Sequence, residues 1–395
     1  MKLMQRHLLL MSFLLIMVSC RKPFNPAVTT ANVNYLVVEG VINSGPDSTI
    51  IKLSRTTPLS SGNKIVIETN ALVTVLSDAG DNYTLSESSP GIYTFYGLNL
   101  PVTKKYCLHI TTSNGEEYQS DFEVNKLTPD IDSLAYTPQK SGVQFYVNTH
   151  DNTNSTRYYR WDYDETWTYF SIYNSVLYYK NQQIIARPID SLVYECYEHA
   201  IPSNSIFVGT SNNLVQDVIS HFPLGYVDAS TGKISHVYSL LVKQYALTPD
   251  AFSYWQLLVK NTEQLGSIFD VQPSSTGGNI HCISHPAEPV IGFISVSTIK
   301  TKRIFVVGNT LPFHVPSQVP PPNPDECGDD SILFIPTFTY DIRLSDIFAT
   351  GDTIPITYLA NPATNMVIGY TFAPIFCVDC RVLGGTNVKP SYWPF

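Results

Sequence analysis

Short segments in which apolar and polar residues alternate fill the chain between residues 33 and 126. The first covers residues 35–42 and ends at residues 43–47, a turn-forming run of Asn, Ser, Gly, Pro and Asp. Residues of high strand propensity in this pattern predict β-strands. Further strands are predicted over residues 49–54, 71–76, 83–85, 91–96, 105–111 and 118–124. Strands at this spacing indicate a small β-sandwich, immunoglobulin-like in outline, over residues 33–126.

A longer alternation marks the second part of the chain, which we expect to form a larger, mainly-β domain over residues 127–395. Between residues 157 and 168, charged residues at positions 160, 162 and 164 are interleaved with aromatic ones. Neighbouring side chains of a strand point to opposite faces, so the pattern predicts one aromatic face packed into a core. That face consists of Tyr159, Trp161, Tyr163 and Trp167.

One prominent helix of this larger domain is predicted to begin at Thr248 and to end before Gly266. Thr248 is a good N-cap, Pro249 suits the first helical position, and Asp250 suits the positively polarised start of a helix. Apolar residues at helical spacing should form its buried stripe. These residues are Phe252, Trp255, Leu258 and Val259.

The first twenty residues have the parts of a secretory signal. A short basic start precedes the apolar run 8–18, which is shorter than the about 20 residues that span a bilayer. Residues 17–20, Met-Val-Ser-Cys, are similar to a bacterial lipobox, in which the cysteine sulfur receives diacylglycerol and becomes the new N-terminus. We therefore predict a lipoprotein signal peptide over residues 1–20, lipidation of Cys20, and a proline-containing tether over residues 21–32.

Composition narrows the classes of function. The net charge of −9 and the pI near 5.4 argue against nucleic acid as a partner. A hydrophobic content of 44% in 395 residues is enough for a folded body with a large core. After the signal, no sequence segment is long and apolar enough to cross a membrane, so we expect attachment through the lipid alone.

Six of the seven cysteines remain when Cys20 is set aside. An exported chain meets an oxidising compartment, where an even number of cysteines suggests disulfides, although the sequence does not choose the pairs. A crosslink from Cys327 to Cys377 or Cys380 would restrain a long proline-rich loop. The candidate disulfide residues are Cys196, Cys327, Cys377 and Cys380.

Other chemistry is weakly indicated. The Cys377-x-x-Cys380 pair follows a strand-like stretch rather than opening a helix, which disfavours redox catalysis, and zinc needs about four ligands. His281, Cys282 and His285 are of ligand type, but Pro286 rules out a regular helix beyond them. The sequence also lacks the nucleophile elbow, the metalloprotease motif and the nucleotide-binding loops. We therefore predict no catalytic residues, no enzyme activity, no cofactor and no metal.

Aromatic side chains indicate possible binding surfaces, because their faces stack on sugars and anchor protein interfaces. Tyr173, Tyr178 and Tyr179 follow the core-facing alternation and are the candidate ligand or partner contacts. A loop over residues 311–330, which contains three consecutive prolines, is a second candidate for such contacts.

The characteristic segments of the chain are residues 241–248, 265–274, 278–281, 288–293 and 302–305, together with a C-terminal motif over residues 377–381, 384–390 and 393. These segments resemble a family of Bacteroidota lipoproteins catalogued as domain of unknown function 4249. The resemblance covers nearly all of the mature chain and is specific in its second half. Members are often encoded beside TonB-dependent outer-membrane receptors. This implies a role in nutrient uptake but no catalytic residue.

The resemblance therefore implies a non-enzymatic outer-membrane lipoprotein that binds a ligand for, or docks on, a TonB-dependent receptor. The ligand stays open between a small molecule, a peptide and a glycan. Arg21 and Lys22 stand where surface-exposed lipoproteins of this phylum usually carry acidic residues, so either face of the outer membrane remains open. The alternatives are a structural or adhesive cell-envelope protein and, third, an enzyme with an unrecognised site.

Replacing Cys20 tests the anchor. Cys20→Ser should abolish acyl labelling and release the protein from membranes, because a membrane-bound lipoprotein is held by its acyl chains. The measurement is metabolic labelling with a fatty acid, followed by fractionation. A Cys20→Ser protein that stays in the membrane fraction without a lipid contradicts the predicted anchor.

Overall fold

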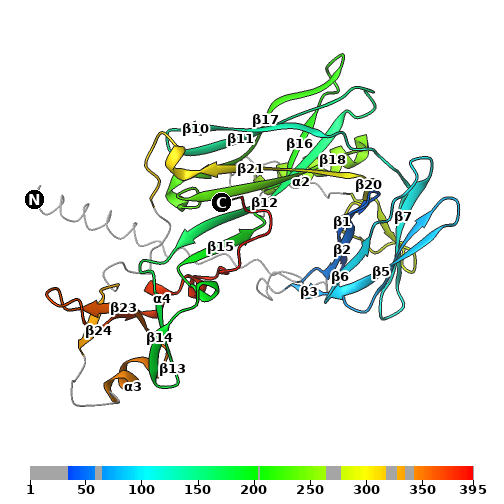
Figure 1. The fold of residues 1–395 in the computed structure, drawn as a ribbon. Helices are drawn as coiled ribbons and strands as arrows, with labels where there is room; N and C mark the ends of the chain where they lie inside the picture. The colour runs from blue at the N-terminus through cyan, green and yellow to red at the C-terminus, as the bar shows by residue number, and fades with distance from the viewer. Residues whose placement is uncertain are drawn as a thin grey trace, which may run out of the picture.

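The computed structural model describes residues 34–57, 65–202, 205–263, 277–316, 327–333 and 342–394. These residues form mainly β-structure, as the sequence predicts, arranged as two sheet assemblies and a smaller lobe (Figure 1). None of the helices in these ranges has both the length and the apolar character to cross a membrane. Cys20 and the tether lie outside the described residues.

The N-terminal assembly is one sheet with the strand order β19-β8-β7-β4-β5-β6-β2-β1-β20, with β3 beside β2 and β9 beside β7. Residues 82–85 of β5 pair with β4 and residues 86–89 pair with β6, so β5 links the two halves of the sheet. The apolar faces of both halves share one core. Its strands are β1 (Leu36–Asn43), β2 (Ser48–Arg55), β3 (Val66–Ile67), β4 (Leu72–Ser77), β5 (Asn82–Ser89), β6 (Ile92–Tyr96), β7 (Lys105–Thr111), β8 (Glu117–Ser120), β9 (Glu123–Val124), β19 (Ile280–Cys282) and β20 (Ser295–Ser297).

Two strands of this sheet come from far along the chain, beyond the predicted boundary at residues 126 and 127. β19 pairs with β8 and β20 pairs with β1, at the two ends of the strand order. Residues 277–298, here called the crossing segment, therefore complete the N-terminal sheet. Each of its strands has three residues, too few to show an alternation that sequence analysis detects. The immunoglobulin-like outline stays a prediction.

The second assembly consists of two sheets around an aromatic core. A three-stranded sheet has the order β10-β11-β17, and a five-stranded sheet has the order β15-β12-β18-β21, with β16 beside β12. Both sheets contribute to one buried cluster. The strands are β10 (Ile131–Gln139), β11 (Gly142–Asp151), β12 (Tyr158–Phe170), β15 (Glu195–Ala200), β16 (Phe207–Thr210), β17 (Asp217–Asp228), β18 (Val237–Ala246) and β21 (Ile299–Val307).

Strand β12 supplies much of that core and confirms the predicted aromatic face, since its four predicted aromatic side chains are buried there. Glu165 lies in the same core and is 3% exposed. Lys233 forms an ion pair with its carboxylate, and the hydroxyl of Tyr238 donates a hydrogen bond to it at 2.9 Å. The buried charge is thus both paired and hydrogen-bonded, as a charge in an apolar core requires.

Helix α2 (Pro249–Glu263) begins where the sequence predicts, and the amide of Ala251 donates to the hydroxyl of Thr248 at 3.3 Å. The predicted stripe is correct only in part. Phe252 is buried, whereas Trp255 is half-buried, with its ring centroid 4.3 Å from the guanidinium carbon of Arg160 on β12. Tyr254 and Ala251, which the stripe omitted, are buried between α2 and the N-terminal assembly.

A smaller lobe lies beside the second assembly, at the lower left of Figure 1. Its parts are β13 (Leu177–Lys180), β14 (Gln183–Ala186), β22 (Asp330–Leu333), β23 (Thr353–Ala360), β24 (Val367–Pro374), α3 (Ile342–Phe348) and α4 (Ile375–Val378). β13 and β14 form a hairpin, and the other strands form a sheet in the order β22-β24-β23. Short 3-10 helices complete the described chain: η2 (Ile189–Ser191), η3 (Ala229–Thr231), η4 (Gly308–Thr310) and η6 (Cys380–Leu383).

Two disulfides hold this lobe, and they use all four candidate cysteines. Cys327 pairs with Cys377 inside the lobe, with the Cα atoms 5.7 Å apart. Cys196 on β15 pairs with Cys380, with the Cα atoms 5.8 Å apart, which ties the lobe to the second assembly. The remaining two cysteines are buried free thiols, Cys107 and Cys282.

Candidate binding site at the junction of the two assemblies

The crossing segment closes on itself where it meets the N-terminal sheet. The side chain of Asn279, 5% exposed, donates to the carbonyl of Ile294 and accepts from its amide, both at 2.9 Å. The two backbones approach closely here, since a Cβ on Gly278 would lie 1.8 Å from the carbonyl oxygen of Gly292. Only glycine fits there. Asn279 therefore joins the two ends of the sheet, because it directly precedes the edge strand β19 and Ile294 directly precedes the edge strand β20.

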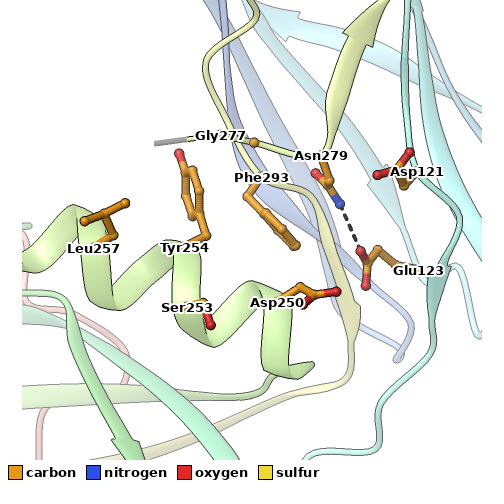
Figure 2. A pocket seen from close by; sticks show the side chains of 10 residues that line it. Asp121, Glu123, Asp250, Ser253, Tyr254, Leu257, Gly277, Asn279 and Phe293 are labelled. Carbon is orange, nitrogen blue, oxygen red and sulfur yellow. Dashed lines mark hydrogen bonds between the residues drawn. The ribbon is translucent and has the colours of Figure 1, made fainter. Parts of the chain in front are cut away.

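A cavity of about 330 Å³ lies beside Asn279, between α2 and the chain from β8 to β9 (Figure 2). Its volume falls in the range of small-molecule sites. The lining residues are Asp121, Glu123, Asp250, Ser253, Tyr254, Leu257, Gly277, Gly278, Asn279 and Phe293. The cavity thus combines residues from the N-terminal sheet, the helix and the crossing segment.

The wall of this cavity has an apolar side and an acidic side (Figure 2). The rings of Tyr254 and Phe293 pack with their centroids 5.3 Å apart and line it together with Leu257. Asp121 and Glu123 come from the chain around β9, and Asp250 comes from the first turn of α2. No lysine or arginine belongs to the lining set, so its formal charge is negative.

Glu123 is the most enclosed of these carboxylates. Its Oε1 accepts from the side-chain amide of Asn279 at 3.1 Å, and its Oε2 lies 3.5 Å from the hydroxyl of Thr248. Burial raises the pKa of the Glu123 carboxyl above its usual value, and the neighbouring charge of Asp250 raises it further, while the Asn279 hydrogen bond acts in the opposite direction. The ionised form is therefore incompletely compensated, and a positive group beside it would be stabilised.

The lining residues are suited to binding rather than to covalent chemistry. Among the lining residues, Ser253 has a hydroxyl of the kind that serves as a nucleophile in enzymes. This hydroxyl donates a hydrogen bond to the carbonyl of Pro249 at 2.9 Å. A catalytic serine needs a base within hydrogen-bond reach, and no histidine or lysine lines this cavity. A ligand with a cationic group could pair with a carboxylate of the lining, and its apolar part could pack on the aromatic side.

The predicted contact residues lie elsewhere, in the lobe, where the structure gives each a packing partner. The hydroxyl of Tyr173 donates to the carbonyl of Cys327 at 2.5 Å. Tyr178 faces the guanidinium of Arg187 at 5.6 Å, and the ring of Tyr179 packs on Phe348 at 5.6 Å. All three are half-buried. Half of the predicted proline-rich loop, residues 317–326 with the three consecutive prolines, lies outside the described residues.

Sequence reasoning did not identify the cavity. Asp250 was recognised as a favourable charge at a helix start, and residues 278–281 belong to a segment that resembles a family. Neither signal places Asp250, Asn279 and Glu123 together. Their proximity depends on the crossing segment returning to the N-terminal sheet, which is a long-range pairing.

Comparison with known proteins yields a family. The profile of a family described as domain of unknown function (DUF4249) matches residues 21–303. The match includes the N-terminal assembly, α2, the crossing segment and the β13–β14 hairpin of the lobe, and it ends before the three-stranded sheet of the lobe and the C-terminal motif. A search of the curated proteins gives no match.

Proposed function

The chain belongs to the DUF4249 family, and we propose that it is a non-enzymatic lipoprotein of the outer membrane that serves TonB-dependent nutrient uptake. In this proposal the junction cavity receives a ligand that carries a cationic group next to an apolar body. The observation that carries the ligand class is the cavity itself, whose lining contains three carboxylates and two aromatic rings.

Membrane attachment is supported by the sequence. A signal with a lipobox-like end at Cys20 and a proline-containing tether place a lipid at the start of the mature chain. The folded body begins with β1 at Leu36, so the N-terminal assembly follows the tether directly. The membrane is thus a proposed partner through the lipid. Stable anchoring requires about two acyl chains, and a diacylglycerol group on Cys20 would supply them.

The ligand class follows from charge and shape. The half-buried carboxylate of Glu123, whose pKa is raised by burial, gains stability when a cation comes within contact distance. Tyr254 and Phe293 supply an apolar surface beside it, and aromatic rings favour stacking with flat or cationic groups. An amine or guanidinium attached to an aromatic or aliphatic body fits both sides of the cavity.

Service to a receptor is supported by the resemblance of the chain to lipoproteins that are often encoded beside TonB-dependent receptors. Physically, a binding protein held at the outer membrane raises the local concentration of its ligand near a transporter in the same membrane. The cavity lies beside the packed core of the N-terminal assembly, and Tyr254 and Phe293 of its lining belong to a buried apolar cluster, so the proposed site lies between packed elements.

A structural or adhesive role is the second candidate, and one observation favours it. The lobe and the turn after its hairpin expose apolar side chains, with Ile189 at 88% and Met366 at 67% exposure. Other exposed apolar residues of the lobe are Ile185, Tyr358 and Val367. Exposed apolar groups gathered on one part of a molecule often mark contact surfaces.

Binding of a simple aromatic amine tests the ligand class. Tryptamine, added to the purified mature protein, should bind more tightly than its neutral analogue indole-3-ethanol, because only the amine pairs with the carboxylates. Glu123→Gln should weaken tryptamine binding about tenfold, since a hydrogen bond to a charged group contributes about 1.5 kcal/mol. Isothermal titration calorimetry at low salt measures both effects.

The matched control is Asp47→Asn, which removes an exposed carboxylate outside the cavity and should leave binding unchanged. Because the pKa of Glu123 is raised, its ionised form costs stability at neutral pH, and the cost vanishes as the pH falls through that raised pKa. Glu123→Gln should therefore raise the melting temperature at pH 7 but leave it unchanged at about pH 4. Equal binding of the amine and the alcohol, or unchanged binding by Glu123→Gln, contradicts the proposed site.

Co-purification separates the two candidate functions. The native lipoprotein, extracted from outer membranes in mild detergent, should carry a TonB-dependent receptor with it, identified by mass spectrometry. The Cys20→Ser protein serves as the control, since it should be absent from the membrane extract. Recovery of the lipoprotein without any receptor, together with binding to host or cell-surface polymers, favours the adhesive role instead.

A further inference from the structure

Three side chains of metal-ligand type meet at the end of strand β19. Cys282 is the last residue of the strand, and His285 and Glu288 follow in the next turn. One potential ligand atom from each lies within 4.8 Å of the others. The cluster is separate from the junction cavity, whose lining includes none of these residues.

The turn is held in place by hydrogen bonds rather than by a helix. The amide of Ile283 donates to the carbonyl of Glu117 at 2.7 Å, and the amide of Glu117 donates to the hydroxyl of Ser284 at 2.8 Å. The amide of Glu288 donates to the carbonyl of His285 at 2.8 Å. These contacts bring His285 and Glu288 back toward Cys282. Pro286 excludes a regular helix at this position, but the turn brings the three side chains together without one.

The surroundings of the free thiol Cys282 suit a metal ligand better than a disulfide partner. Its sulfur accepts the backbone amide of His285 at 3.3 Å, a contact that offsets negative charge on sulfur. The other free thiol, Cys107, lies between Tyr106 and Leu108, whose side chains face the core of the N-terminal sheet. Alternation puts Cys107 on the opposite face, whereas Cys282 belongs to that core. The two thiols therefore cannot pair without rearrangement of the sheet.

The surroundings of the cluster carry more negative than positive charge. The guanidinium of Arg55 contacts three carboxylates, with N···O distances of 2.6 Å to Glu68, 3.5 Å to Glu116 and 3.9 Å to Glu288. One positive charge does not neutralise three negative ones. The hydroxyl of Tyr118 also contacts Glu116 and Glu288, at 2.9 and 3.0 Å. Arg55 and Tyr118 thus orient the carboxylates, as groups around metal ligands do.

A fourth ligand is available next to this cluster. The Oε1 atom of Glu116 lies 4.0 Å from the Nδ1 atom of His285, while its Oε2 atom faces Arg55 and Tyr118. The Oε1 atom of Glu116 therefore lies on the side of the carboxylate that faces His285. A set of one sulfur, one nitrogen and carboxylate oxygens suits a borderline metal ion, whereas calcium and magnesium prefer oxygen ligands alone.

We propose that Cys282, His285 and Glu288 bind a zinc ion, with Glu116 as the fourth ligand. Binding displaces the thiol proton of Cys282 to solvent, so the ion is held by a thiolate, an imidazole and carboxylates. Glu116 directly precedes β8, and the other ligands lie at or after the end of β19. The ion would therefore link the edge strand β19 to β8. The proposal is independent of the ligand class proposed for the junction cavity.

The proposal is tested with zinc itself on the mature chain, after treatment with EDTA and its removal. The protein should bind one zinc per chain, measured by calorimetry and by elemental analysis, and its melting temperature should rise with zinc. His285→Ala should weaken zinc binding more than about tenfold. With cobalt in place of zinc, the thiolate-to-cobalt charge-transfer absorption should appear, and Cys282→Ser should abolish it.

Two matched controls exclude general effects. His281→Ala removes a histidine of similar exposure that faces Asp121 instead, and Cys107→Ser removes the other buried thiol, so both should bind zinc as the unaltered protein does. The His285 side chain is 65% exposed, so its replacement leaves the core intact, which thermal unfolding without metal verifies. Absence of stoichiometric zinc binding, or equal binding by His285→Ala and His281→Ala, overturns the proposal.

Discussion

The structure depends on satisfying the two edges of the N-terminal sheet. Without further strands, β1 and β8 would each end the sheet with a row of unpaired backbone donors and acceptors, a condition that invites aggregation. Both edges are paired by the same crossing segment, β8 by β19 in antiparallel fashion and β1 by β20 in parallel fashion. Asn279 then bridges the two ends through its amide. A long-range return of the chain is therefore a condition for a complete N-terminal core.

The same return positions both proposed sites. Asn279 and Phe293 of the crossing segment line the junction cavity, and Cys282, His285 and Glu288 form the proposed zinc site. The segment then leaves through Thr298, whose hydroxyl accepts the amide of Thr128 at 2.9 Å, and enters β21 of the second assembly. Interface residues such as Phe252, Tyr254 and Val41 share one apolar cluster. The two assemblies are thus coupled where the binding groups lie.

Local features of the fold were predictable because local sequence encodes them. The alternation of β12, the cap at Thr248 and the four disulfide cysteines each rest on a short pattern, and the structure agrees with them. The partners of each cysteine, the three-residue strands β19 and β20, and the meeting of Glu123 with Asn279 were not predictable. They depend on contacts between residues that are distant in the sequence, from 50 positions for Cys327 and Cys377 to 184 for Cys196 and Cys380, and no periodicity records such contacts. The contact between Trp255 on α2 and Arg160 on β12 is likewise a contact between distant positions.

Hydrogen exchange measured by mass spectrometry tests the central role of the crossing segment most directly. If this segment completes the N-terminal sheet, amides of residues 280–282 and 291–297 should exchange as slowly as those of β1 and β8, and all should be released in one cooperative unfolding step. The account would be contradicted if these amides exchanged rapidly while β1 and β8 stayed protected. Exchange of the segment together with β12 and β18, but apart from β1 and β8, would contradict it equally.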